Sequence, residues 1–294
     1  MTDSTDAATT TGTAPDGTQA QRRRKGVDLL TTLSGLDPAD AAKAERMASG
    51  MERRHGALGS FAVDHVLGNL WSRPQLSRRD RSMIVVAFLA TIGSTEELEA
   101  HVNGALNHGL SEAEVREVVN QVAGYAGFPM AMAATRIVDA VVMRRNGLDR
   151  LPDKEAAASL DDDARARNAT DVLGTLFGGR TSTDPANAKS GTSAALGGVG
   201  ELAFEFAFGE LWSRNELSRR DRSMITVAIL GMLKAADELA IHVPGALNHG
   251  VTREEVEEVM VQLTVYGGFP RAVEGIKAAR AAFAKIDARA ASGR

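Results

Sequence analysis

Two glutamate–histidine pairs are the residues of this chain whose types and spacing best suit chemistry. Glu97 precedes His101 by four positions, and Glu238 precedes His242 by the same spacing. Residues four apart on a helix lie on one face and can touch. A carboxylate beside an imidazole fixes the ring's orientation and raises its pKa, which suits general acid–base catalysis. These four residues are therefore candidate catalytic residues, with a structural surface or interface pair as the alternative.

Helix capping is a second explanation for the first glutamate. Ser94 and Glu97 have the spacing of a capping box, in which a hydroxyl and a carboxylate satisfy the free N–H groups of a helix start. In the other pair, Ala235 takes the place of the serine while Glu238 remains. Capping alone therefore does not explain both glutamates.

Two arginines and two tyrosines recur in matched positions and are candidate substrate-binding residues. Arg81 and Arg222 could bind a substrate carboxylate, since a guanidinium matches it bidentately, or they could bridge helices. Tyr125 and Tyr266 each precede a Gly-Phe-Pro turn. A phenol there could donate to a developing oxyanion, and core packing is the alternative.

The remaining candidates are a histidine and a tryptophan. His108, like its counterpart His249, falls in the last turn of a helix, where a cation complements the helix dipole. We keep His108 as a candidate substrate contact. Trp71 is a further candidate, although the pattern favours Trp71 and Trp212 as core or interface anchors over ligand stackers.

Composition excludes several classes of function. The net charge of −4 lacks the basic footprint of a nucleic-acid-binding protein. The absence of cysteine excludes disulfides, thiolate catalysis and Cys-ligated metals. No ligand cluster predicts a metal, and no Gly-rich loop follows a strand, so we expect no cofactor. Without an apolar run of membrane length or a signal peptide, we expect a cytoplasmic protein with no membrane partner.

An internal repeat organises the whole chain. LWSRPQLSRRDRSMI at residues 70–84 returns as LWSRNELSRRDRSMI at residues 211–225, and GALNHG at 104–109 returns at 245–250. The constant offset of 141 residues indicates two domain-sized copies. The predicted organisation is a disordered tail, a first repeat, a linker and a second repeat, at residues 1–20, 21–148, 149–163 and 164–294.

Helical periodicity and capping signals place the candidates on helices. No alternating strand pattern appears, so we expect an all-α fold of two similar domains. Gly109 suits the left-handed position after a helix. The main expected elements are a helix over 38–54 capped by Asp37, a helical segment over 56–71, and helices beginning at capping boxes Ser77–Asp80, Ser218–Asp221, Ser111–Glu114 and Thr252–Glu255.

These motifs together resemble the carboxymuconolactone decarboxylase family of the alkylhydroperoxidase-like superfamily. The resemblance rests on LWSRPQLSRRDRSMI, on Glu-Leu-x-x-His at 97–101, on GALNHGLSEAEV from Gly104, and on the Tyr-Ala-Gly-Phe-Pro turn at 125–129, each with a second copy. It implies rings of six domains, hence a homo-oligomer of three tandem chains. It also implies cofactor-free loss of CO2 from a small-molecule carboxylate or lactone.

The resemblance separates this chain from the peroxidases of the superfamily. Their two cysteines would fall at Ser94 and Glu97, and at Ala235 and Glu238, so thiol redox chemistry is not expected. Our hypothesis makes His101 and His242 proton donors oriented by the glutamates, with the arginines holding carboxylate. A tailoring step of secondary metabolism and a non-catalytic scaffold are alternatives. Because Pro244 is expected to kink the helix of the second copy, and the N-terminal half of that copy is Gly-rich, we favour the first copy if only one is catalytic.

Overall fold

The computed structural model describes residues 17–151 and 160–292. Residues 1–16 of the predicted tail and 152–159 of the predicted linker lie outside the described residues. Every regular element in the described part is helical and no strand occurs there, which confirms the predicted all-α fold. No described helix combines the length and the apolar character needed to cross a bilayer.

The described residues group into two compact units. The N-terminal unit holds residues 17–31 and 37–72, and the main unit holds residues 32–36 and all described residues from 73 onward. The boundary at residue 72 lies inside the first predicted domain, so the compact units do not follow the repeat boundaries. The two repeat-sized domains therefore stay a prediction.

The N-terminal unit contains the first helices of the first repeat. Its elements are most of α1 (Gln19–Leu33), the 3₁₀ turn η1 (Pro38–Asp40), α2 (Ala41–His55), α3 (Ala57–Phe61) and the π-helical η2 (Ala62–Leu70). Asp37 caps η1, because its side chain accepts a hydrogen bond from Ala39 N. The predicted helices over 38–54 and 56–71 are thus confirmed, each divided into two pieces.

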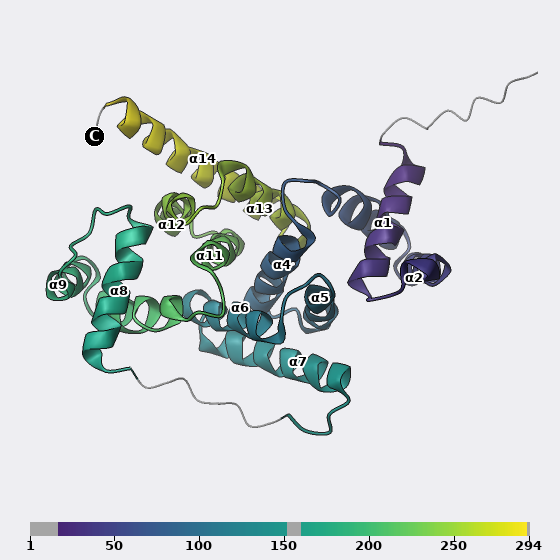
Figure 1. Ribbon diagram of the computed structural model, residues 1–294. Coiled ribbons are helices and arrows are strands. Elements are labelled where there is room, and N and C mark those ends of the chain that lie inside the picture. Colours follow the sequence, from purple (N-terminus) through teal and green to yellow (C-terminus); the bar gives the residue numbers. More distant parts are fainter. Residues whose placement is uncertain (1–16, 152–159, 293–294) are drawn as a thin grey trace, which may run out of the picture. The chain divides into compact units, whose positions relative to one another are not determined.

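The main unit contains the rest of both repeats (Figure 1). The first repeat supplies α4 (Arg78–Ile92), α5 (Thr95–Asn107), α6 (Glu112–Tyr125) and α7 (Phe128–Asn146). The second repeat supplies α8 (Asp162–Leu176), α9 (Pro185–Leu196), α10 (Gly198–Leu202), π-helical η3 (Ala203–Phe208), the 3₁₀ turn η4 (Leu211–Ser213), α11 (Arg219–Leu233), α12 (Ala236–Asn248), α13 (Arg253–Tyr266) and α14 (Phe269–Ala291).

The equivalent helices α4 and α11 form the centre of the main unit. Every residue from Asp80 to Thr91 and from Asp221 to Met232 is buried. Helices without a polar face are expected to be enclosed on all sides. The two helices pack on each other, and each packs on a helix of the other repeat, α4 on α13 and α11 on α6 (Figure 1). The repeats therefore share one core.

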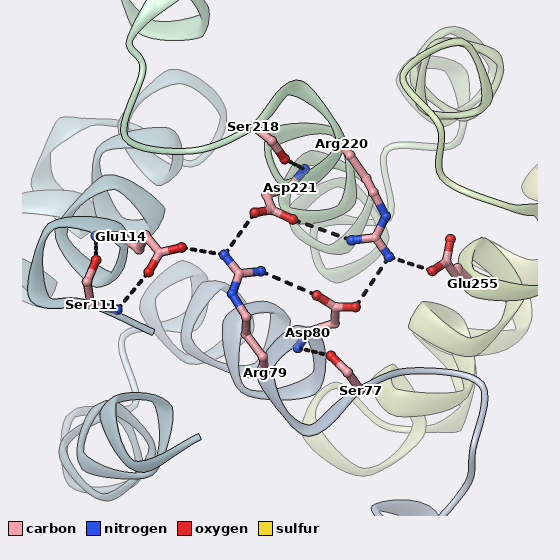
Figure 2. Close-up of polar contacts among 9 residues, drawn as sticks. All are labelled: Ser77, Arg79, Asp80, Ser111, Glu114, Ser218, Arg220, Asp221 and Glu255. Atoms are coloured by element: carbon pink, nitrogen blue, oxygen red, sulfur yellow. Dashed lines mark hydrogen bonds and ion pairs between the residues drawn. The ribbon is translucent and has the colours of Figure 1, made fainter. Parts of the chain in front are cut away.

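Serine side chains cap the first turns of α4 and α11, but the capping boxes predicted there are incomplete. Ser77 accepts from Asp80 N at 3.0 Å, and Ser218 accepts from Asp221 N at 3.1 Å. The predicted boxes at Ser77 and Ser218 are nevertheless only half formed, because their carboxylates bind arginines instead (Figure 2). The full capping boxes expected at the starts of α6 and α13 are both present.

An arginine–aspartate exchange joins the starts of α4 and α11. Arg79 Nη2 donates to Asp221 Oδ2 at 2.9 Å, and Arg220 Nη2 donates to Asp80 Oδ2 at 3.2 Å. Figure 2 shows the two contacts as a near-symmetrical pair, each arginine also reaching the capping glutamate of its own repeat. The arrangement fixes the register of the two central helices.

Close backbone approach positions the helices that carry the candidate histidines. A Cβ at Gly104 of α5 would lie 2.2 Å from Leu33 Cδ1, and a Cβ at Gly245 of α12 would lie 2.2 Å from Leu176 Cδ1. Only glycine permits such contacts, so the repeated GALNHG motif has a packing function. α12 runs through Pro244 without interruption, from Ala236 to Asn248.

Candidate active site

His242 lies in a cluster of aromatic rings drawn from both repeats. Tyr125, the last residue of α6, presents its ring edge-on to the imidazole, with centroids 5.4 Å apart. Trp212 of η4 stacks on the same imidazole at 6.2 Å. Trp212 Nε1 donates a hydrogen bond to Tyr125 Oη at 2.8 Å. We call Tyr125, Trp212 and His242 the His242 site.

His101 lies in the equivalent arrangement with the roles of the repeats exchanged. Tyr266, the last residue of α13, meets the His101 ring edge-on at 5.3 Å, and Tyr266 Oη is 3.3 Å from His101 Nε2. Phe88 of α4 stacks on Tyr266 at 6.2 Å. We call these three residues the His101 site. Each site thus combines a histidine from one repeat with a tyrosine from the other.

Both imidazoles are neutral at physiological pH. Burial lowers the pKa of His101 to about 4, with a smaller contribution from His108, and burial likewise lowers the pKa of His242 to about 4. The charge of Glu97 does raise the pKa of His101, as expected, but the loss of solvation outweighs it. Burial and His249 lower the pKa of His242. Neutral imidazole offers one N–H donor and one basic nitrogen.

The two glutamates do not hold the histidines. Glu97 and Glu238 are exposed on α5 and α12. The Ser94 hydroxyl donates to the Glu97 carboxylate, and this hydrogen bond lowers the pKa of Glu97. Among the described residues, neither glutamate hydrogen-bonds to its histidine, and the Ser94–Glu97 capping box does not form. The neighbouring aromatic rings orient the imidazoles, and a catalytic role for the glutamates stays a prediction.

The two candidate arginines bridge helices inside the core. Arg81 is fully buried, and its Nη2 donates to Glu258 Oε1 at 2.8 Å. Arg222 is equally buried and makes the same contact with Glu117 at 2.8 Å. In the structure, therefore, both arginines bridge helices, which was one of the two alternatives considered for them. Substrate binding stays a prediction, and among the described residues only Nε of each guanidinium has no hydrogen-bond partner.

Of the remaining candidates, His108 joins neighbouring helices, and Trp71 lies in the N-terminal unit. His108 Nδ1 is hydrogen-bonded to Ser82 Oγ at 2.8 Å and its Nε2 to Thr32 Oγ1 at 3.1 Å, so both ring nitrogens tie helices together. His249 repeats this with Ser223 at 2.7 Å. Trp71 is buried in the N-terminal unit.

Four buried polar residues that hold the candidate arginines were not predicted from the sequence. Glu117 and Gln121 of α6 recur as Glu258 and Gln262 of α13, all buried beside valines. Polar residues on an otherwise apolar helix face are a detectable signal, and their recurrence at the same offset strengthens it. Their partners, however, lie on helices of the other repeat, which no local pattern reveals.

Within residues 17–151 and 160–292, no three histidine or acidic side chains gather to hold an ion. A cavity of about 660 Å³ is lined by Ala123, two positions before Tyr125, by Leu211, which precedes Trp212, and by Phe128 and Phe206. That volume suits a small organic molecule, and the cavity borders the elements that carry the His242 site.

Comparison with known proteins assigns the family. The carboxymuconolactone decarboxylase family matches residues 58–140 and 198–281, one match in each repeat. The chain belongs to this family, as its motifs predict.

Three curated relatives show how far the similarity extends. The chain is 43% identical over 65 residues to a 4-carboxymuconolactone decarboxylase of Acinetobacter baylyi, covering 22% of this chain and 48% of the relative. It is 40% identical over 76 residues to the nitrosuccinic acid decarboxylase npaB of Metarhizium robertsii, covering 26% and 53%. An uncharacterized 15.0 kDa protein of Paracoccus denitrificans is 28% identical over 85 residues, covering 28% and 63%. The chain thus spans about half to two thirds of each relative's length.

Proposed function

We propose that this chain is a cofactor-independent decarboxylase of a small organic acid, such as a carboxylated lactone. The observation that carries the proposal is the pair of composite sites, each placing a neutral imidazole, buried for His242 and partly buried for His101, edge-on to a phenol. Family membership and the names of two relatives agree with this activity.

The chemistry needs a stabilised anion and a proton. Loss of CO2 from a carboxylate leaves its bonding electron pair on carbon, delocalised onto a neighbouring oxygen. The Tyr125 hydroxyl and the His242 N–H are donors that could stabilise this oxyanion. An anion beside the ring favours imidazolium, so substrate binding raises the histidine pKa and lets it take a proton from water and deliver it to carbon. One CO2 leaves and one proton is consumed.

A carbon dioxide assay tests the proposal directly. Purified protein is incubated with 4-carboxymuconolactone and with nitrosuccinic acid, and CO2 release and ultraviolet absorbance are followed. We expect turnover with at least one carboxylated substrate, a loss of part of it in His101→Gln or His242→Gln, and its abolition in the double variant. A folded double variant with wild-type turnover would remove both histidines from the site.

Two other functions remain as outcomes of this assay. A tailoring reaction on the same scaffold would give substrate consumption without CO2 release. A non-catalytic scaffold would give neither. Hydroperoxide reduction with dithiol donors should stay at background, because the chain has no cysteine.

We further propose that three chains associate as a homo-oligomer. The short helix α10 exposes two large apolar side chains, Val199 at 71% and Leu202 at 67%. Their counterparts Leu58 and Phe61 are exposed on α3 at 69% and 57%. Exposed apolar residues that recur in both repeats are typical of a contact surface used twice.

A further inference from the structure

A chain of buried hydrogen bonds runs from Arg222 toward the His242 site. Arg222 Nη2 donates to Glu117 Oε1 at 2.8 Å, and its Nη1 donates to Gln121 Oε1 at 3.0 Å. Gln121 Nε2 in turn donates to Thr226 Oγ1 at 3.1 Å. Tyr125 follows Gln121 by four positions on α6, so it lies on the same helix face.

The corresponding chain of hydrogen bonds toward the His101 site is broken. Arg81 donates to Glu258 at 2.8 Å and to Gln262 Oε1 at 2.7 Å, as in the other repeat. The residue in the place of Thr226 is Val85, which has no oxygen to accept a hydrogen bond. Gln262 Nε2 is accordingly buried with no hydrogen-bond partner in the described part of the chain.

The Thr226 hydroxyl accepts a hydrogen bond from Gln121, and its own proton can be donated to another partner. Thr91, in the equivalent helix α4, donates its proton to the carbonyl of Ala87 at 2.7 Å. Among the described residues Thr226 makes no such bond to its own helix, although its side chain is fully buried. Burial raises the pKa of the Tyr125 phenol, and hydrogen bonding from Thr226 and Trp212 opposes that rise.

Two donors on one phenol oxygen constrain its own proton. A phenol has one O–H and two acceptor positions. Trp212 Nε1 fills one acceptor position of Tyr125 at 2.8 Å, and the Thr226 hydroxyl is placed to fill the other. The Tyr125 proton then points away from both donors. The Tyr125 O–H can therefore donate a hydrogen bond to a substrate beside His242.

We propose that Thr226 is a positioning residue that directs the Tyr125 hydroxyl to the substrate in the His242 site, and that Val85 leaves the His101 site without this control. The proposal rests on the proposed function for its consequence in turnover. The two sites are then chemically unequal, with the His242 site the faster of the two, although the sequence favours the first repeat.

Nuclear magnetic resonance tests the positioning without any substrate. The chain has two tyrosines, so protein labelled with carbon-13 at tyrosine Cζ gives two signals, and Tyr125→Phe assigns them. We expect Thr226→Val, which keeps the shape but loses the hydroxyl, to move the Tyr125 signal and leave that of Tyr266. Thr226→Ser should restore the wild-type position. The matched control is Thr91→Val, which should leave Tyr125 unchanged. An unmoved Tyr125 signal in Thr226→Val, or an equal displacement in Thr226→Ser, overturns the proposal.

Kinetics in single-site chains test the consequence. In a His101→Gln chain, Thr226→Val should lower kcat about tenfold with little change in KM, because a donor that acts on the developing oxyanion is misaligned. In a His242→Gln chain the same substitution should have no effect. An unchanged kcat in the first chain overturns the role of Thr226 while decarboxylation stands. Absence of turnover in the wild type refutes the proposed function, and the resonance result still decides the positioning.

Discussion

Trp212 donates a hydrogen bond to Tyr125 over 2.8 Å, although the two residues belong to different repeats. The bond joins η4 of the second repeat to the end of α6 of the first, directly beside His242. The His242 site therefore exists only when both repeats are present and correctly docked.

Removing the phenol oxygen of Tyr125 should leave the Trp212 N–H without a partner. We expect Tyr125→Phe to lower the free energy of unfolding by about 1–3 kcal/mol, the usual cost of an unpaired buried donor. Trp212 is one of two tryptophans, so its fluorescence in a Trp71→Phe background reports the change. Tyr266→Phe is the control, and it should leave the Trp212 emission as it is. The same emission in Tyr125→Phe would contradict the contact.

Acidification should destabilise the fold through its buried histidines. The pKa of His242 is about 4 when folded, against an ordinary value of 6.5, so the unfolded chain binds more protons between these two pH values. Stability is therefore complete above about pH 6.5 and falls as the pH drops toward 4, by up to about 1.4 kcal/mol per pH unit for this histidine. Denaturant titrations at several pH values measure the slope. His242→Gln should make it shallower, and an identical slope would show that His242 titrates normally.

Breaking one of the buried arginine pairs should cost far more than breaking a surface pair. Arg222→Met removes the fully buried partner of Glu117 and leaves the carboxylate only its contact with the partly exposed Arg214, so we expect a loss of about 3 kcal/mol in the free energy of unfolding. The matched control is Arg280→Met, which removes an exposed pair with Glu257. Its urea midpoint should stay at the wild-type value. Equal midpoints for the two variants would count against the buried pair as a structural element.

Supplying the missing acceptor should stabilise the contact between the two repeats. Val85→Thr places a hydroxyl where Gln262 Nε2 has no partner, and we expect a gain of about 1 kcal/mol. Val86→Thr buries a hydroxyl at the next position of α4 and serves as the control. It should destabilise the protein or leave it unchanged. A lower melting temperature for Val85→Thr than for the wild type would rule out the explanation.

Assembly should depend on the apolar side chains of α10. Light scattering of the wild type should give the mass of three chains, and Val199→Glu with Leu202→Glu should reduce it. Asp163→Lys, a change at another exposed residue, should leave the mass unaltered. A wild-type mass near 31.1 kDa, that of one chain, would refute the association.

The sequence by itself determined the family, the all-α fold and the duplicated histidines, tyrosines and arginines. These features depend on local patterns, since helix period, capping residues and exact recurrence can be read along one chain. Asp37, Ser111 and Thr252 cap helices as predicted because capping involves residues only a few positions apart.

Tertiary structure decided which partners the repeated residues contact. Glu97 and His101 are close in sequence but do not hydrogen-bond, whereas His101 meets Tyr266, 165 positions away. Arg81 forms an ion pair with Glu258 of the other repeat, and the sequence alone does not reveal this partner. The pKa of an imidazole depends on how much water surrounds it, and that quantity appears only when the helices of both repeats pack together.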